Sequence, residues 1–152
     1  MKKQKNIFII VFIAVFMLIC CRYQNIEKIK AETSTPELTI VSHNISYSDY
    51  IYLMVAVNVN NIDSSVNSVK LLFWDSEQIE YLIDTANYTS LHKGSTTVNG
   101  KYCLIYYSKG IAAKEMADDI YMRAYVEIDG VAYYSEVTKY SVVQYVEDRI
   151  NS

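Results

Sequence analysis

The sequence contains few of the residues from which metal centres and nucleophilic active sites are built. It has two histidines and three cysteines in 152 residues. His43 and His92 lie far apart, each among polar neighbours, and we interpret both as solvent-exposed loop residues. Zinc is held by clustered cysteine or histidine side chains. The sequence therefore predicts no metal-binding and no cofactor-binding residues.

The scarcity of cysteine also excludes a fold held together by disulfides. Cys20 and Cys21 lie in an apolar N-terminal segment, which leaves Cys103 as the single cysteine of the remaining chain. One cysteine cannot form an internal disulfide, so stability must come from the core and the sheets. Because Leu104 and Ile105 follow Cys103 in an apolar strand, we expect a packed and unreactive thiol.

Motifs of enzyme chemistry are absent as well. Glycine occurs only four times, and there is no nucleophile elbow, no dinucleotide-binding glycine motif and no phosphate-binding loop. Asp118-Asp119 is interpreted as a turn pair. Four other acidic residues lack the pattern of a calcium loop and are interpreted as a solvated face: Asp75, Glu77, Glu80 and Asp84. We predict no catalytic residues and expect that the protein is not an enzyme.

The N-terminal segment has the features of an export signal. Lys2, Lys3 and Lys5 precede an apolar run over residues 7–21, which is shorter than the roughly 20 residues of a spanning helix. Ala31 offers a cleavage site, so we predict a signal peptide over residues 1–31 and a secreted or cell-surface protein. Two alternatives stay open: an uncleaved N-terminal anchor, or lipidation at Cys21 in a degraded lipobox.

The charge balance after such a cleavage excludes one class of partner. Residues 1–31 hold six of the 14 basic residues and one of the 17 acidic residues, so the remaining 121 residues have a net charge of −8. An acidic body repels phosphate backbones, and we therefore expect no nucleic-acid partner. Contact with a membrane is expected only through the N-terminal segment. A length of 121 residues fits one domain.

The alternation of apolar and polar residues predicts an all-β fold. A strand over residues 120–128, a type I′ turn at Asp129-Gly130 and a second strand over 131–137 form the clearest hairpin. The turn predicts that Ile128 pairs with Val131, Val126 with Tyr133, Ala124 with Ser135, Met122 with Val137, Tyr125 with Tyr134 and Arg123 with Glu136. Asn99-Gly100 predicts a second hairpin between 96–98 and 101–107.

Further strands are predicted over residues 37–42, 50–59 and 69–74, the last of them buried on both faces. Residues 60–68 are predicted as a loop, whereas 76–85 fits either a helical segment or a loop with a short strand. Residues 32–36 form a short lead-in, and 37–152 are predicted to be a single β-sandwich of about seven or eight strands. Ile111–Asp118 is predicted as a short crossover helix.

The C-terminal residues predict an amphipathic helix over 142–150. Ser141 and Gln144 fit a capping box at its N-terminus. Val142, Val146 and Ile150 recur at helical spacing, and we expect this stripe to be buried on the sandwich.

The stretch from Gly110 resembles a known module. A Gly-Ile-Ala-Ala-Lys-Glu-Met turn precedes the strand hairpin, and a Lys-Tyr-Ser-Val-x-x-Tyr pattern follows it at residues 139–145. With Phe73-Trp74 at a strand end, these motifs are similar to a module of secreted and cell-surface proteins of Clostridia and related Gram-positive anaerobes. The resemblance covers roughly residues 38–150. It implies an immunoglobulin-like sandwich with an accessory role and assigns no catalytic residue.

These observations favour a non-catalytic extracellular or cell-surface module that binds or presents a protein or a cell-wall polysaccharide. Two alternatives stay open. Tyrosine is frequent, with 14 of 15 residues beyond position 31, and together with Trp74 it could form a carbohydrate-binding surface. A small secreted enzyme or inhibitor is the other alternative.

Overall fold

The computed structural model describes residues 35–62 and 68–152, which form two antiparallel β-sheets and one α-helix. The strands are β1 (Glu37–Tyr47), β2 (Ile51–Asn60), β3 (Lys70–Trp74), β4 (Tyr88–Leu91), β5 (Gly94–Val98), β6 (Lys101–Tyr107), β7 (Ile120–Ile128), β8 (Val131–Tyr134) and β9 (Thr138–Tyr140). Two 3-10 turns, η2 (Ile83–Thr85) and η3 (Ala113–Glu115), and the helix α2 (Val142–Ile150) complete the fold.

The predicted signal peptide over residues 1–31 lies outside the described residues, as does most of the 32–36 lead-in. Among the residues that the structure does describe, no helix is long and apolar enough to cross a membrane.

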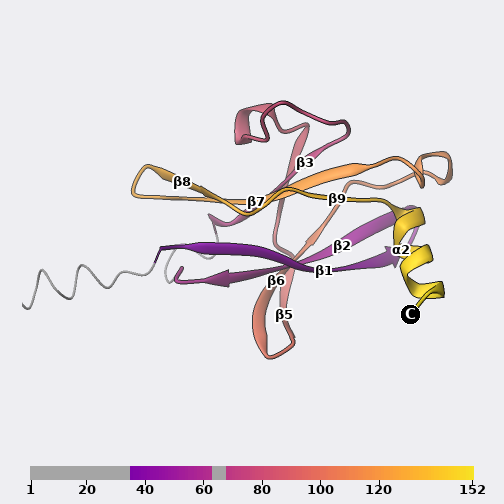
Figure 1. The fold of residues 1–152 in the computed structure, drawn as a ribbon, viewed down its shortest axis with the longest axis horizontal. Coiled ribbons are helices and arrows are strands. Elements are labelled where there is room, and N and C mark those ends of the chain that lie inside the picture. Colours follow the sequence, from indigo (N-terminus) through magenta and orange to yellow (C-terminus); the bar gives the residue numbers. More distant parts are fainter. Residues whose placement is uncertain (1–34, 63–67) are drawn as a thin grey trace, which may run out of the picture. The chain divides into compact units, whose positions relative to one another are not determined.

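The strands form one sheet of order β1-β2-β6-β5 and a second of order β4-β3-β7-β8, in which β9 also pairs with β7 (Figure 1). The predicted all-β class is therefore confirmed. The described residues form nine strands, more than the seven or eight expected, because neither β4 nor β9 was predicted. The predicted strand over residues 131–137 ends at Tyr134 as β8, and β9 begins only at Thr138. β1 is also longer than the predicted 37–42 strand.

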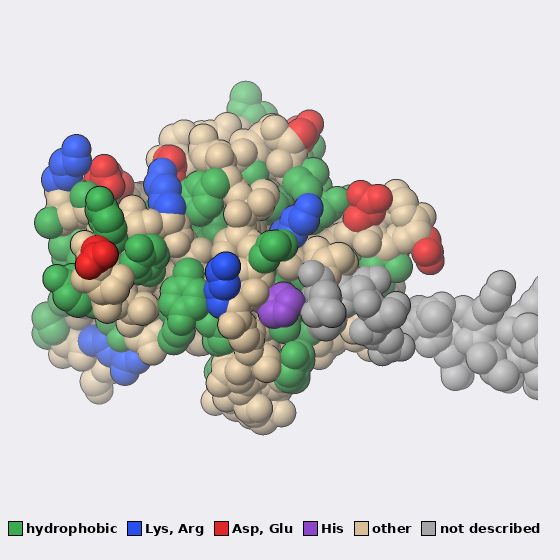
Figure 2. Space-filling view, turned by 180° about the vertical axis from the view of Figure 1, so that it is seen from behind, with side chains coloured by type: hydrophobic (Ala, Val, Ile, Leu, Met, Phe, Trp, Pro, Cys, Tyr) green, Lys and Arg blue, Asp and Glu red, His purple; other side chains and the backbone are tan. Residues whose placement is uncertain are grey.

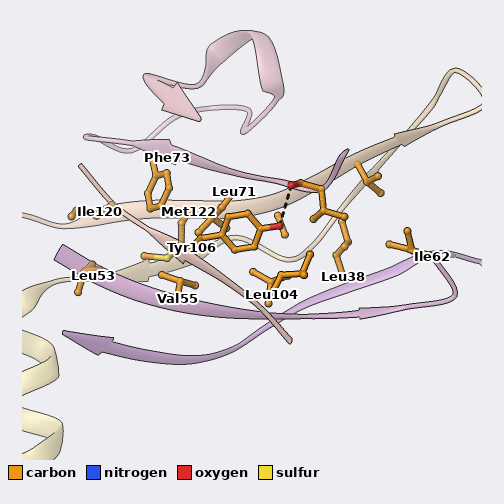
Figure 3. Packing of buried hydrophobic residues seen from close by; sticks show 14 of the residues in the cluster. Leu38, Leu53, Val55, Ile62, Leu71, Phe73, Leu104, Tyr106, Ile120 and Met122 are labelled. Carbon is orange, nitrogen blue, oxygen red and sulfur yellow. Dashed lines mark hydrogen bonds between the residues drawn. The ribbon is translucent and has the colours of Figure 1, made fainter. Parts of the chain in front are cut away.

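The core lies between the two sheets, where the apolar faces of the alternating strands meet (Figure 3). Leu53, Val55 and Leu104 from the first sheet pack with Leu71 and Met122 from the second, and all five are buried. The Tyr106 hydroxyl lies within this core and donates to the Val69 carbonyl at 3.0 Å, so its polar atom is satisfied (Figure 3). Every second residue of β2 and of β7 thus faces the other sheet, and these residues supply the two halves of the core.

Both predicted two-residue hairpin turns are confirmed. Asn99 and Gly100 have φ angles of 50° and 77°, and Asp129 and Gly130 have 52° and 77°. These left-handed conformations are those of a type I′ turn, which Asn-Gly and Asp-Gly adopt readily. From Ile128↔Val131 to Tyr125↔Tyr134 the register of β7 and β8 is the predicted one.

The predicted contact between Ala124 and Ser135 is confirmed, because the Ser135 N–H donates to the Ala124 carbonyl at 2.9 Å. Beyond Ser135 the predicted register fails. Met122 pairs with Thr138 instead of Val137, because the chain inserts one extra residue between β8 and β9. Arg123 does not depend on Glu136 for its contacts: its guanidinium donates to the backbone carbonyls of Ser135 and Tyr81. A bulge of one residue thus replaces the expected continuous strand.

Two predicted helical segments are smaller than expected. Within Ile111–Asp118 only the three residues of η3 are helical, so the predicted crossover helix is a single 3-10 turn. Residues 76–85 form a loop that ends in η2, and they contain neither a strand nor an α-helix. Both segments are too short to form stable α-helices on local interactions alone.

The predicted C-terminal helix is confirmed over residues 142–150, with the Ser141 hydroxyl accepting from the Gln144 amide at 3.1 Å. The Gln144 side chain does not complete the predicted capping box, because it donates to Asp148 Oδ1 at 2.8 Å. The expected buried stripe is wrong: Val142 is 2% exposed, but Ile150 is 77% exposed. The helix therefore docks through its first turn.

Candidate functional site

The clearest candidate site is a groove of about 260 Å³ on the outer face of the first sheet. On β2 and β6 the lining residues alternate with the core-facing ones, β5 contributes two alternate residues, β1 contributes three consecutive residues, and α2 closes one side. The lining residues are Ser42, His43 and Asn44 from β1, Met54 and Ala56 from β2, Thr96 and Val98 from β5, Ile105 from β6 and Arg149 from α2. Four strands and one helix thus build a single concave surface.

The chemistry of the groove is that of a binding surface. Met54, Ala56, Val98 and Ile105 supply apolar contact area, while hydroxyl and amide groups lie among them. Arg149 is the one residue with a permanent charge among the described lining residues. Such a combination of an apolar base with a few polar groups is typical of sites that recognise a ligand by shape and orientation.

Tyr145 fixes the helix against the edge of the groove. Its hydroxyl donates to Asn44 Oδ1 at 2.8 Å, and the same oxygen accepts from the Ile45 amide at 2.8 Å. The Arg149 guanidinium lies over the Tyr145 ring, 5.3 Å from its centroid. The contact between Tyr145 and Asn44 therefore positions the groove's cationic side chain.

The histidines do not occupy the exposed loop positions that we expected. His43 lies in β1, half-buried, with its ring stacked on Tyr140 at a centroid distance of 4.3 Å. Burial lowers the pKa of His43 below its ordinary value of 6.5, and Asp148 only partly offsets this effect. His92 does lie in a loop but is half-buried, and its ring meets Tyr106 edge-on at 6.5 Å.

A second, acidic hollow of about 190 Å³ is lined by Asp75, Lys109, Ile111, Glu115, Asp118, Asp119 and Ile120. Several of its carboxylates have partners within the chain. Asp75 forms an ion pair with Lys109, Asp119 pairs with Lys139 at 3.1 Å, and Glu115 accepts from the Ala112 amide at 3.2 Å. In the described part of the chain, no three His, Cys, Asp or Glu side chains are grouped so that they could hold a metal ion.

Trp74 is buried, which is contrary to the alternative of a sugar-binding surface that includes it. It forms a second apolar cluster with Leu72 and Tyr125 on the face of β3 and β7 that points away from the main core. Its indole donates to Thr85 Oγ1 at 3.1 Å, and Tyr81 packs edge-on at 5.0 Å. The loop between β3 and β4 thus covers Trp74, which excludes it from contact with a ligand.

Exposed tyrosines lie elsewhere. Tyr47 and Tyr50 flank the turn between β1 and β2 and are 79% and 52% exposed. A Cβ atom on Gly110 would lie 2.8 Å from Cγ of Tyr50, so the two residues pack tightly. Figure 2 shows several hydrophobic side chains at its left-hand end, which is the end that carries α2 in Figure 1.

The predicted packing of Cys103 is confirmed, since the residue is fully buried and unpaired. Sequence reasoning missed a structural role for two other small polar residues. Ser108 and Ser135 are buried at strand ends, and their hydroxyls accept from the amides of Leu53 at 3.0 Å and Ala124 at 2.9 Å. Each hydroxyl also donates, at 2.8 Å, to the carbonyl of the residue that follows it in the sequence. Both serine hydroxyls therefore continue the hydrogen bonding between two strands at the point where one strand turns away from the other.

No protein-family model, no curated protein and no solved structure matches this chain. Function is therefore inferred from the geometry of the groove and from the sequence.

Proposed function

We propose that the chain is a non-catalytic, exported binding module with an immunoglobulin-like sandwich, and that its groove binds a polypeptide at the cell surface. The observation that carries this proposal is the lining of the groove: an apolar base, a polar rim and one arginine. Apolar pockets of this kind accept the side chains of a partner, and arginine is enriched where proteins meet.

A polypeptide fits this lining better than a polysaccharide does. Sugar rings bind by stacking on exposed Trp or Tyr faces. The described lining residues include neither Trp nor Tyr, and Trp74 is covered by its own loop. Met54 and Ile105 instead offer apolar contact area, and the flexible Met54 side chain can adapt to the apolar side chains of a partner.

Binding also fits the groove better than catalysis does. His43 is the one histidine in the described lining, and burial lowers its pKa, which favours the neutral ring. No carboxylate or thiol lies among those lining residues to orient it or to act as a nucleophile. A general base needs a substrate proton within hydrogen-bond reach and a partner that holds its tautomer.

Selection from a displayed library of random linear peptides tests the site. We expect enriched peptides whose binding is lost in Met54→Glu, which places a carboxylate in the groove. Tyr52→Glu is the matched control, because it adds the same charge to the same strand outside the groove lining. Equal binding by both variants, or no enrichment at all, would contradict the proposal.

The exported location has its own test. Intact mass of the protein from the culture medium should give a chain that begins near Glu32. A cell-bound product that retains Met1 would indicate an anchor, and a lipid on Cys21 would indicate a lipoprotein.

A second candidate function is carbohydrate binding at the turn between β1 and β2. The exposure of Tyr47 and Tyr50, with Tyr50 packed on Gly110, favours it. Binding to insoluble cell-wall polysaccharide that is lost in Tyr47→Ala and Tyr50→Ala, but kept in Met54→Glu, would support this second function over the first.

A further inference from the structure

Strand β5 is an edge of the first sheet that lacks the features by which proteins prevent strand addition. Its sequence, Gly-Ser-Thr-Thr-Val, contains no charged residue and no proline, and its pairing with β6 is regular. Among the described strands only β6 pairs with it. Uncharged, regular edges of this kind are templates for another strand.

The other edges of the two sheets are protected or interrupted. The register of β1 with β2 shifts between Ile40 and Ser42, and Tyr145 of α2 binds the far half of β1 at Asn44. In the second sheet, β8 and β9 form one edge, beside β7, and this edge is interrupted by the bulge between them. β4 has only four residues. β5 is therefore the edge best suited to receive a strand.

Hairpin geometry identifies the backbone groups that point outward. In a two-residue hairpin the residues that flank the turn, here Val98 and Lys101, form a hydrogen-bonded pair, and such pairs alternate along the ladder. The N–H and C=O groups of Ser95 and Thr97 therefore point away from β6. Figure 1 shows the β5–β6 hairpin extending from the rest of the domain.

The charges around this edge favour an acidic partner. Residues 92–102 contain Lys93 and Lys101 and no acidic residue, and Arg149 lies in the adjacent groove. The protein beyond residue 31 has a net charge of −8, so this cationic region is a local exception. In a symmetric pairing a second copy would bring its own cationic β5 edge against this one, whereas an acidic segment of another protein would be attracted.

We propose that the groove's polypeptide partner is an extended, acidic segment that adds to β5 as a further strand, an inference that rests on the proposed function. Its backbone pairs with Ser95 and Thr97. Thr96 and Val98 line the groove, so alternate side chains of the added strand lie beside them at its rim. Main-chain hydrogen bonds supply affinity in this mode, and the side-chain positions supply selectivity.

The test compares Thr97→Pro with Thr97→Val on peptides selected from the displayed library. Proline removes the outward N–H at a position where an edge strand tolerates it, whereas valine keeps the N–H and removes only the hydroxyl. We expect at least about a tenfold loss of affinity for Thr97→Pro and little change for Thr97→Val. Lys93→Ala and Lys101→Ala should each weaken binding by about two- to fivefold, less so at high salt.

Hydrogen exchange gives a readout that does not depend on how well the proline variant folds. In the unmodified protein, peptide binding should slow exchange of the Ser95 and Thr97 amides, whereas the Thr96 amide is already paired with β6. Selected peptides should be rich in Asp or Glu and in β-branched residues.

The outcomes separate this inference from the proposed function. If the selected peptides bind Thr97→Pro at full affinity but no longer bind Met54→Glu, strand addition is overturned and the groove remains the binding site. Absence of any selected peptide would overturn both. A concentration-dependent dimer in sedimentation that Thr97→Pro abolishes would identify a second copy as the occupant and overturn the acidic partner.

Discussion

Ser135 offers a sharp test of how the second sheet is held together at its bulge. The residue is 3% exposed, its hydroxyl accepts from the Ala124 amide at 2.9 Å and it donates to the Glu136 carbonyl at 2.8 Å. Ser135→Ala removes both interactions and leaves the Ala124 N–H without its partner beside the core. An unsatisfied buried polar group costs about 1–3 kcal/mol, a substantial part of the roughly 5–15 kcal/mol of a typical domain.

Urea unfolding measures this loss directly. With a slope of about 1–3 kcal/mol per molar for a small domain, the midpoint should fall by about 1 M while the slope stays constant. Ser95→Ala is the matched control, since it removes a hydroxyl from an exposed strand position. Ser108→Ala repeats the experiment in the first sheet, where the hydroxyl accepts from the Leu53 amide at 3.0 Å.

The two serine substitutions also make a combined prediction. Ser108 and Ser135 lie in different sheets and share no hydrogen-bond partner, so their effects should add in the double variant. A midpoint for Ser135→Ala that matches that of Ser95→Ala would refute the view that the hydroxyl completes the ladder.

Three further predictions concern other parts of the fold. Val142→Ala should lower the free energy of unfolding by about 1.5 kcal/mol, whereas Ile150→Ser should change it by less than about 0.5 kcal/mol; equal effects would mean that the whole helix face is buried. Because burial lowers the pKa of His43, stability should be complete above its ordinary value of 6.5 and decline as the pH falls towards the folded-state pKa. Urea midpoints of His43→Phe should decline less over that range, and an unchanged decline would refute this. A thiol reagent should label Cys103 only in denaturant; rapid labelling of the folded protein would contradict its burial.

The parts of the fold that the sequence predicts are those set by neighbours along the chain. Alternation over residues 120–128 and the Asp129-Gly130 turn are local, and the observed register from Ile128 to Tyr125 follows from them. The Ser141 cap is equally local. Such features need only the preferences of a few consecutive residues, so they can be predicted without knowledge of what packs against them.

The bulge between β8 and β9 could not be predicted in this way. Ser135 and Val137 continue the alternation of the strand, and nothing in the sequence distinguishes a serine on a strand face from one whose hydroxyl replaces a backbone carbonyl. Likewise, Val146 and Ile150 have the spacing of a buried stripe, but burial depends on a surface to receive them. Val142 is covered by the core, and the later turns are not.

The candidate groove is hidden from sequence analysis for a related reason. Its lining comes mostly from the outward-facing positions of four strands and from one helical residue, and its first and last residues, Ser42 and Arg149, lie more than a hundred positions apart along the chain. Neither Met54 nor Thr96 belongs to a recognisable sequence motif. Until the order of the strands is known, such outward-facing positions cannot be distinguished from ordinary solvent-exposed residues. Pairing β2 with β6 and β6 with β5 brings these positions onto one face, and Tyr145 brings Arg149 beside them. The same pairing leaves β5 at the edge, so the groove and the strand that borders it are both products of strand order.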